Sequence, residues 1–208
     1  MKILHTADWH LGQTFYEYDR REEHLHFLEW LKQQIRQHEI DVLLIAGDVF
    51  DSPNPSAESQ RMYYRFLREV TSENPSLQII IIAGNHDSAA RLEAPNPLLE
   101  DMNIIVRGTV RRNAEGDIDL QHFIVPLYTE GKVTAYCLAV PYLRQGDYPS
   151  AENYSKGVQQ LYEQLFNKVK EKGIPVVAMG HLQATGSEIS EDDRSERTVI
   201  GGLECVSP

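Results

Sequence analysis

The segment LQIIIIAGNHDS, residues 77–88, carries the pattern that decides the fold. Its apolar, β-branched run is typical of a strand that is buried on both faces. A glycine ends the run, and Asn85, His86 and Asp87 follow at once. The segment IDVLLIAGDVFD, residues 40–51, repeats the arrangement. Because ligands of open α/β sheets bind where strands end, the repeat predicts a sheet whose strand ends carry the chemistry.

Helical patterns separate the apolar runs. Apolar side chains recur at helical spacing in residues 19–38, 56–72 and 153–172, and residues 89–101 favour short helical pieces. Further strands are expected at residues 2–7, 103–108, 118–126, 133–140 and 174–179. Uninterrupted strands separated by helices predict a layered α/β domain, with helices covering both faces of the sheet.

The composition is that of a globular protein. The 208 residues, 41% hydrophobic and 25% charged, suffice for one large domain or two small ones. No apolar run approaches the roughly 20 residues of a membrane-spanning helix, and the N-terminus lacks a signal-peptide pattern. Because Cys137 and Cys205 lie far apart, no disulfide framework is expected, and a reducing cytoplasm is the expected location. The net charge of −11 opposes a nucleic-acid-binding function without excluding it.

Four of the expected strands end in a polar cluster, in the segments HTADWH, AGDVFDS, AGNHDS and AMGHL. Side chains two positions apart on an extended segment point the same way, so Asp8 and His10 can reach one ion. Gly47 and Gly84 allow sharp turns at two of the strand ends. Each cluster alone is better explained as a cap, a turn or a packed histidine. The four together, in this order, indicate a single site.

The order of Asp-x-His, Gly-Asp-x-x-Asp, Gly-Asn-His-Asp and a later Gly-His resembles the calcineurin-like metallophosphoesterase superfamily. The segments ILHTADWHLGQTFY, REEHLHFLEWL, IAGDVFD, IAGNHDS and VPYLR extend the resemblance, over essentially the whole chain, to the bacterial SbcD nucleases. This resemblance implies an α/β fold, a layered sandwich of mixed β-sheets flanked by helices. It also implies a DNA exonuclease and endonuclease that processes DNA ends and hairpins with an SbcC-type ATPase subunit and forms a homodimer.

The resemblance further implies a centre with two divalent metal ions. Such a pair clamps the oxygens of a phosphodiester and lowers the pKa of a bridging water. Asp8 and His10 would hold the first ion, Asp48 would bridge, and Asn85 and His181 would hold the second. Mixed oxygen and imidazole ligands favour Mn²⁺ and related first-row ions, and leave Zn²⁺ and Fe²⁺ open.

Two further residues are candidate catalytic groups. His86 would sit beside the scissile phosphate, where it stabilises charge or protonates the leaving oxygen. Asp87 would orient His86, a role that rests on spacing alone. Asp51, the last acid of Gly-Asp-x-x-Asp, is expected to make structural hydrogen bonds rather than to bind metal.

The superfamily pattern ends in Gly-His-x-His, but no histidine follows His181 in this chain. We therefore expect residues 1–208 to form a metallophosphoesterase domain that is truncated before that motif and lacks a capping domain. Each metal site would then lack one protein ligand, which weakens metal binding and makes this fragment a candidate for an inactive enzyme.

Two other functions compete with the nuclease. One is a phosphoesterase of the same fold that acts on small phosphodiesters or phosphoproteins, which the acidic charge favours. The other is a non-catalytic interaction domain in which the polar cluster is structural. An intact His86 beside Asn85 argues against the second alternative, because a structural site has no evident use for that imidazole.

Overall fold

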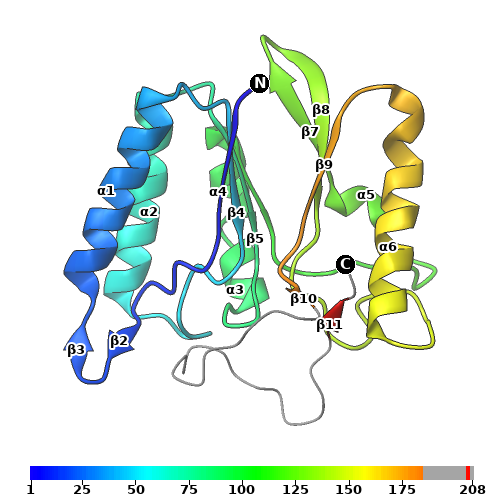
Figure 1. The fold of residues 1–208 in the computed structure, drawn as a ribbon, viewed down its shortest axis with the longest axis horizontal. Helices are drawn as coiled ribbons and strands as arrows, with labels where there is room; N and C mark the ends of the chain where they lie inside the picture. The colour runs from blue at the N-terminus through cyan, green and yellow to red at the C-terminus, as the bar shows by residue number, and fades with distance from the viewer. Residues whose placement is uncertain (185–204, 207–208) are drawn as a thin grey trace.

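Two β-sheets pack against each other at the centre of the molecule (Figure 1). The computed structural model describes residues 1–184 and 205–206, so the expected domain of residues 1–208 includes positions outside the described residues. The first sheet is entirely parallel. Its strands, in spatial order, are β1 (Ile3–Thr6), β4 (Val42–Ala46), β5 (Gln78–Ile82) and β6 (Ile104–Arg107).

The second sheet is mixed. Strand β8 (Lys132–Ala139) pairs antiparallel with β7 (Ile124–Thr129) and parallel with β9 (Val176–Met179). Two short pairs lie outside the sandwich. They are the hairpin of β2 (Thr14–Phe15) and β3 (Tyr18–Asp19), and the parallel pair of β10 (Gln183–Ala184) and β11 (Cys205–Val206).

Helices cover the outer faces of the sandwich (Figure 1). Helices α1 (Arg21–Gln37) and α2 (Ala57–Glu73) pack on the first sheet, and α6 (Tyr154–Val169) packs on the second. The side chain of Ser56 accepts a hydrogen bond from the Ser59 amide and so caps the start of α2. The shorter helices are α3 (Ala89–Glu93), α4 (Asn96–Leu99), η1 (Glu100–Met102), α5 (Leu120–Phe123) and η2 (Lys170–Lys172).

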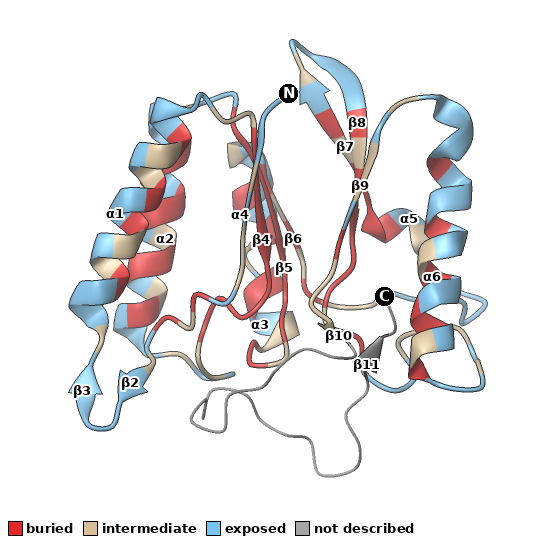
Figure 2. Ribbon diagram, viewed as in Figure 1, coloured by how far each residue is buried: buried red, intermediate tan, exposed pale blue. Residues whose placement is uncertain are grey.

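The two central strands β4 and β5 are buried over their whole length (Figure 2). Because side chains alternate along a strand, each strand divides its apolar residues between two cores. Leu43 and Ile45 of β4 join the core beneath α1 and α2. Leu44 and Ala46 join the core between the sheets, where they meet the second sheet. An uninterrupted apolar run is therefore the pattern that this position requires.

Two sequence predictions need correction. Helices do not cover both faces of the first sheet, because its inner face packs on the second sheet and not on helices. The strand expected at residues 118–126 begins only at Ile124, since residues 120–123 form the short helix α5. The Asp119 side chain accepts a hydrogen bond from the Gln121 amide at 3.1 Å and so caps that helix. No helix among the described residues is long and apolar enough to cross a membrane.

A buried polar cluster links α5 to the segment after β6. Glu93 accepts hydrogen bonds from the amide and hydroxyl of Thr109 and from Arg111. The imidazole of His122 lies 3.8 Å from the same carboxylate and is 5% exposed. Burial, together with the charges of Arg107 and Arg111, lowers the pKa of His122 from 6.5 to about 4. The native state therefore holds His122 neutral.

The depressed pKa of His122 predicts a loss of stability in mild acid. Between pH 6.5 and 4 the unfolded chain binds a proton at this position that the native chain does not. The free energy of unfolding should thus be unaffected by His122 above pH 6.5 and fall by up to about 3 kcal/mol as the pH falls to 4. Urea denaturation at several pH values measures this slope. His122→Gln should flatten it and the exposed control His26→Gln should not, whereas equal slopes for His122→Gln and the wild-type chain would contradict the assignment.

Candidate metal centre

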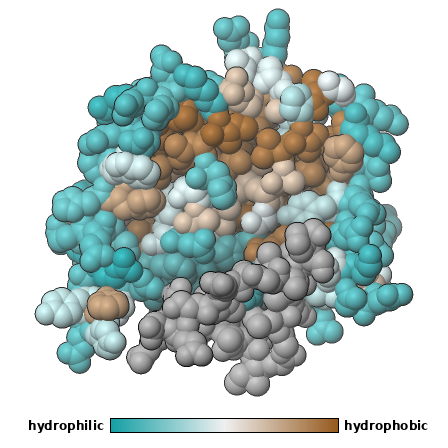
Figure 3. All heavy atoms as spheres, in the orientation of Figure 1, coloured by the Kyte–Doolittle hydropathy of each residue, from teal (hydrophilic) through white to brown (hydrophobic). Residues whose placement is uncertain are grey.

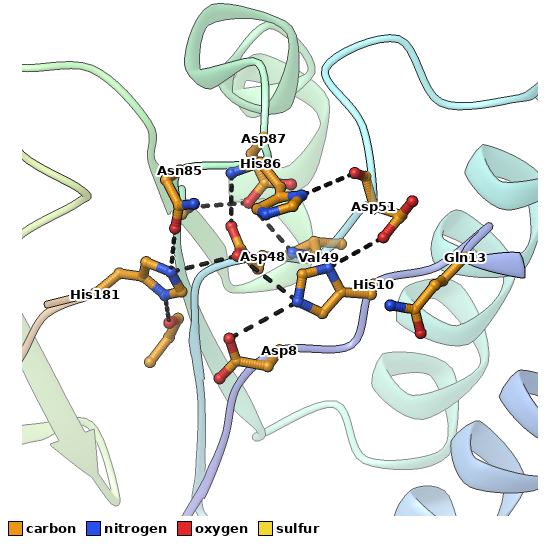
Figure 4. A network of polar contacts seen from close by, with 12 residues as sticks. Asp8, His10, Gln13, Asp48, Val49, Asp51, Asn85, His86, Asp87 and His181 are labelled. Carbon is orange, nitrogen blue, oxygen red and sulfur yellow. Dashed lines mark hydrogen bonds and ion pairs between the residues drawn. The ribbon is translucent and has the colours of Figure 1, made fainter. Parts of the chain in front are cut away.

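The parallel strands β1, β4 and β5 deliver polar residues to one edge of the first sheet (Figure 4). Asp8 and His10 follow β1, Asp48 follows β4, and Asn85 follows β5. Backbone hydrogen bonds from Asp8 to Gly47 (3.1 Å) and from His10 to Asp48 (3.0 Å) join the first two loops. His181 reaches the same place from the end of β9 in the second sheet. All five predicted metal ligands therefore come together.

The buried carboxylate of Asp48 lies at the centre of this arrangement. Its Oδ2 atom is 3.4 Å from Nε2 of His181 and 3.7 Å from Nε2 of His10. Its Oδ1 atom accepts a 2.8 Å hydrogen bond from the amide of His86. Burial acts to raise the pKa of Asp48, but the contact with His181 and the His86 amide outweigh it, and the pKa lies below its ordinary value. Asp48 is thus an ionised carboxylate between two imidazoles, able to act as a metal ligand through its oxygen atoms.

His181 is oriented by a backbone carbonyl. Its Nδ1 atom donates to the carbonyl of Ala46 at 2.8 Å, which directs Nε2 toward Asp48 and toward Oδ1 of Asn85 at 2.9 Å. Burial opposes the charged ring, yet the contacts with Asp48 and Ala46 raise the pKa of His181 to about 9. A histidine whose second nitrogen is held by a carbonyl is the usual arrangement of a metal ligand.

The opposite side of the centre is formed by His10 and two acids. Nε2 of His10 lies 4.0 Å from Oδ1 of Asp8, whose side chain is 60% exposed. Nδ1 of His10 lies 3.4 Å from Oδ1 of Asp51. This buried nitrogen makes no hydrogen bond within the described part of the chain. Both ring nitrogens of His10 therefore face carboxylates.

The donor set fits divalent metal ions. Two groups of side chains each bring one ligand atom per residue within 4.8 Å of one another: Asp8, Asp48 and His181, and His10, Asp51 and His86. Carboxylate oxygens with imidazole nitrogens suit first-row divalent ions. The division differs from the predicted one, which placed Asp8 with His10. It also includes Asp51 and His86, which were not expected to bind metal.

Residues 1–203 match the family model of the calcineurin-like phosphoesterases. The chain belongs to this family. Three curated proteins, each named as the SbcD subunit of the nuclease SbcCD, are similar to it. That of Rhodobacter capsulatus is 40% identical over 100% of the chain, that of Escherichia coli K12 is 30% identical over 99%, and that of Bacillus subtilis is 28% identical over 100%. The chain spans about half the length of these relatives, 54%, 52% and 52% respectively.

Within this phosphoesterase domain, His86 is held by a neighbouring loop. Its Nδ1 atom lies 2.9 Å from the carbonyl of Asp51. A carbonyl only accepts hydrogen bonds, so Nδ1 carries the proton and Nε2 is left to meet another group. The ring packs edge-on against His10 at a centroid distance of 4.9 Å.

The structure gives the carboxylate of Asp87, predicted to orient His86, hydrogen bonds to backbone amides. The buried carboxylate of Asp87 accepts hydrogen bonds from three amides, those of Val49 (3.2 Å), Phe50 (3.0 Å) and Gly84 (2.9 Å). Burial raises the pKa of Asp87 although these donors oppose it. Asp87 therefore joins the loop after β4 to the loop after β5. The group that contacts the His86 imidazole is the backbone carbonyl of Asp51.

Asp51 is the residue that sequence reasoning undervalued. Asp51 is the last acid of the Gly-Asp-x-x-Asp motif. Its carboxylate faces His10, and its backbone carbonyl faces His86. The motif itself is the only sequence signal for this double contact, because the contact depends on how two loops fold back.

The backbone of the centre is strained. Asp8, His10 and Asp48 adopt left-handed conformations, with φ of 56°, 43° and 49°. Such conformations cost of order 1 kcal/mol each in residues other than glycine and gather at functional sites. Gly84 is required for a different reason, since a Cβ atom there would collide with the amide and carboxylate of Asp48. The loops after β1 and β4 are therefore locally less stable, and this strain accompanies the placement of Asp8, His10 and Asp48 in the site.

Asp87→Asn should destabilise the fold. The amide group of asparagine would point a donor at one of the three backbone amides that now donate to the carboxylate. We expect the free energy of unfolding to fall by about 1–3 kcal/mol, measured by urea denaturation against the exposed control Asp101→Asn. Unchanged stability together with a shifted pH profile of phosphoester hydrolysis would instead restore the role of orienting His86.

Proposed function

We propose that this chain is the catalytic domain of a metal-dependent phosphodiesterase that acts on DNA as an exonuclease and endonuclease. The observation that carries the proposal is the position of Asp48, whose Oδ2 atom lies between the Nε2 atoms of His10 and His181. A carboxylate between two imidazoles is the arrangement that a bridging ligand needs. The similarity to proteins named as a subunit of the nuclease SbcCD supports DNA as the substrate.

We assign the metal ligands as the motifs imply. Asp8 and His10 would hold one ion, Asn85 and His181 would hold the other, and Asp48 would contribute a carboxylate to both, with Mn²⁺ as the favoured metal. Two divalent ions bound close together neutralise the charge of a phosphodiester and activate water. The contact of Asp51 with Nδ1 of His10 would fix the orientation of that ligand.

His86 is assigned the proton transfer to the leaving oxygen. Because Nδ1 is occupied by the carbonyl of Asp51, Nε2 is the atom that can carry and release a proton toward the substrate. The packing of the ring against His10 keeps it beside the metal ligands. The residue is thus a catalytic group in this proposal and not a metal ligand.

The wider assembly is also a proposal. The relatives are named as one subunit of SbcCD, so we infer an SbcC-type ATPase subunit as the partner, and a homodimer, in DNA repair and recombination. The net charge of −11 favours the alternative, a phosphoesterase for small phosphodiesters or phosphoproteins. Manganese-dependent cleavage of hairpin DNA supports the nuclease, and cleavage of a small diester alone supports the alternative.

Removal of the bridging carboxylate should abolish metal binding. In a calorimetric titration of the chain with Mn²⁺, we expect two binding events in the wild type. Both should be lost in Asp48→Ala, because the Asp48 carboxylate lies close to His10 of one assigned ligand set and to His181 of the other. The exposed control Asp101→Ala should bind as the wild type does. If Asp48→Ala binds Mn²⁺ with undiminished affinity, the bridging role is wrong.

His86→Gln should separate catalysis from metal binding. Loss of a general acid costs about 10²–10⁴-fold in rate, so hydrolysis of bis(p-nitrophenyl) phosphate should fall by this factor while Mn²⁺ affinity stays unchanged. The exposed control His38→Gln should retain the wild-type rate. A variant that loses folding stability but keeps its rate would contradict the catalytic role of His86 and make the residue a structural one.

A further inference from the structure

The hairpin of β2 and β3 exposes an unusual concentration of aromatic surface. Phe15, Tyr16 and Tyr18 are 64%, 78% and 79% exposed. Ten large hydrophobic side chains are exposed among the described residues, and these three fall within four consecutive positions. Figure 3 shows the hairpin projecting from the body at the lower left. Clustered exposed rings of this kind mark an interaction surface.

The backbone arranges the rings on a small platform. Phe15 pairs directly with Tyr18 across the antiparallel hairpin, so their side chains share one face. The ring of Tyr16 stands edge-on to that of Phe15, with a centroid distance of 4.9 Å. Tyr16 occupies the turn in a left-handed conformation, with φ of 56°.

The platform is joined to the candidate metal centre by a short, fastened segment. Phe15 lies five residues after His10, so at about 3.5 Å per residue its Cα atom lies within roughly 18 Å of the His10 Cα atom. The amide of Gln13 donates to the carbonyl of His10 at 2.9 Å, and Arg20 donates to the side chain of Gln13. A substrate that reaches the metal centre can therefore extend to the platform within a few nucleotides.

The charges around the platform favour contact with bases over contact with phosphates. Glu17 and Asp19 lie in the hairpin. The two arginines that follow are engaged with acids, Arg20 with Glu23 at 2.7 Å and Arg21 with Glu58 at 2.6 Å. A phosphate backbone is bound by unpaired basic groups, whereas aromatic rings stack on the faces of unpaired bases whatever their sequence.

We propose that Phe15, Tyr16 and Tyr18 form a stacking platform for unpaired nucleotide bases next to the cleavage site. The proposal deepens the proposed function and rests on it, because it names single-stranded tails and opened ends as the part of the DNA that the domain grips. Base stacking on aromatic rings tolerates any sequence. The platform would therefore select single-stranded DNA over duplex DNA, without preference for a base sequence.

The test is a binding measurement with the 208-residue chain and Ca²⁺ in place of Mn²⁺, so that the carboxylates are neutralised while hydrolysis is suppressed. Fluorescence anisotropy compares a blunt duplex with the same duplex carrying a single-stranded thymine tail. In the variant Phe15→Ala/Tyr16→Ala/Tyr18→Ala we expect the affinity for the tailed duplex to fall at least about tenfold. The affinity for the blunt duplex and the salt dependence of binding should be unchanged, because no phosphate contact is removed.

Two controls make the result specific. Tyr16→Phe/Tyr18→Phe keeps the rings and should retain the affinity of the wild type. Phe166→Ala removes a ring of α6 that is 49% exposed, far from the hairpin in sequence, and should bind as the wild type does. Circular dichroism checks that each variant is folded, and the single ring variants replace the triple one if it is not.

Several outcomes would overturn the platform. They are an equal loss of affinity for the blunt and tailed duplexes, no loss for either, no measurable binding by the wild-type chain, or a change in sedimentation that makes the hairpin a contact between copies. Hydrolysis of bis(p-nitrophenyl) phosphate by the wild-type chain with Mn²⁺ is measured separately. If that activity is missing while the tail-specific loss is found, the hydrolytic function fails, and only the binding of unpaired bases by the platform is supported.

Discussion

The burial of the Asp48 carboxylate is the constraint on which the rest of the site depends. An aspartate whose side chain is 4% exposed must be compensated by donors or cations, since an unpaired buried charge costs several kcal/mol. Here the compensation comes from three different segments, through His10, His181 and the amide of His86. Both sheets of the sandwich must therefore be in place before this charge is satisfied. The candidate metal centre therefore forms only when both sheets are folded and packed together.

Much of the fold was predictable because local patterns decide it. The apolar runs ending at Ala46 and Ile82 leave few alternatives to buried parallel strands, and helical spacing marked α1, α2 and α6. What covers the inner face of the first sheet was not predictable from these patterns, since an apolar strand packs equally well on a helix or on another sheet. The helix at residues 120–123 was missed for a similar reason, as its four residues make a single turn that periodicity cannot distinguish from a strand.

The candidate site was predictable in its members but not in its contacts. Spacing and motif order brought together Asp8, His10 and Asp48, because parallel strands end at the same edge of a sheet. The contacts of Asp51 and Asp87 depend instead on how two loops lie against each other, which no spacing encodes. Asp87 stands next to His86 in the sequence, yet its carboxylate turns toward the amides of Val49, Phe50 and Gly84. Adjacency in the chain was therefore a poor guide to which group holds the imidazole.

The gathering of acids at this edge also constrains the order of events in the proposed reaction. Asp8, Asp48, Asp51 and Asp87 lie on loops that meet there, against the three imidazoles of His10, His86 and His181. A phosphodiester is itself an anion, and in a chain of net charge −11 it would be repelled from such a cluster. Divalent ions held by these carboxylates would neutralise them and attract a phosphate, so the repulsion of DNA from this edge would be removed once the ions bind. The acidic composition and a nucleic-acid substrate are then compatible, because the attraction arises at the centre and not over the surface.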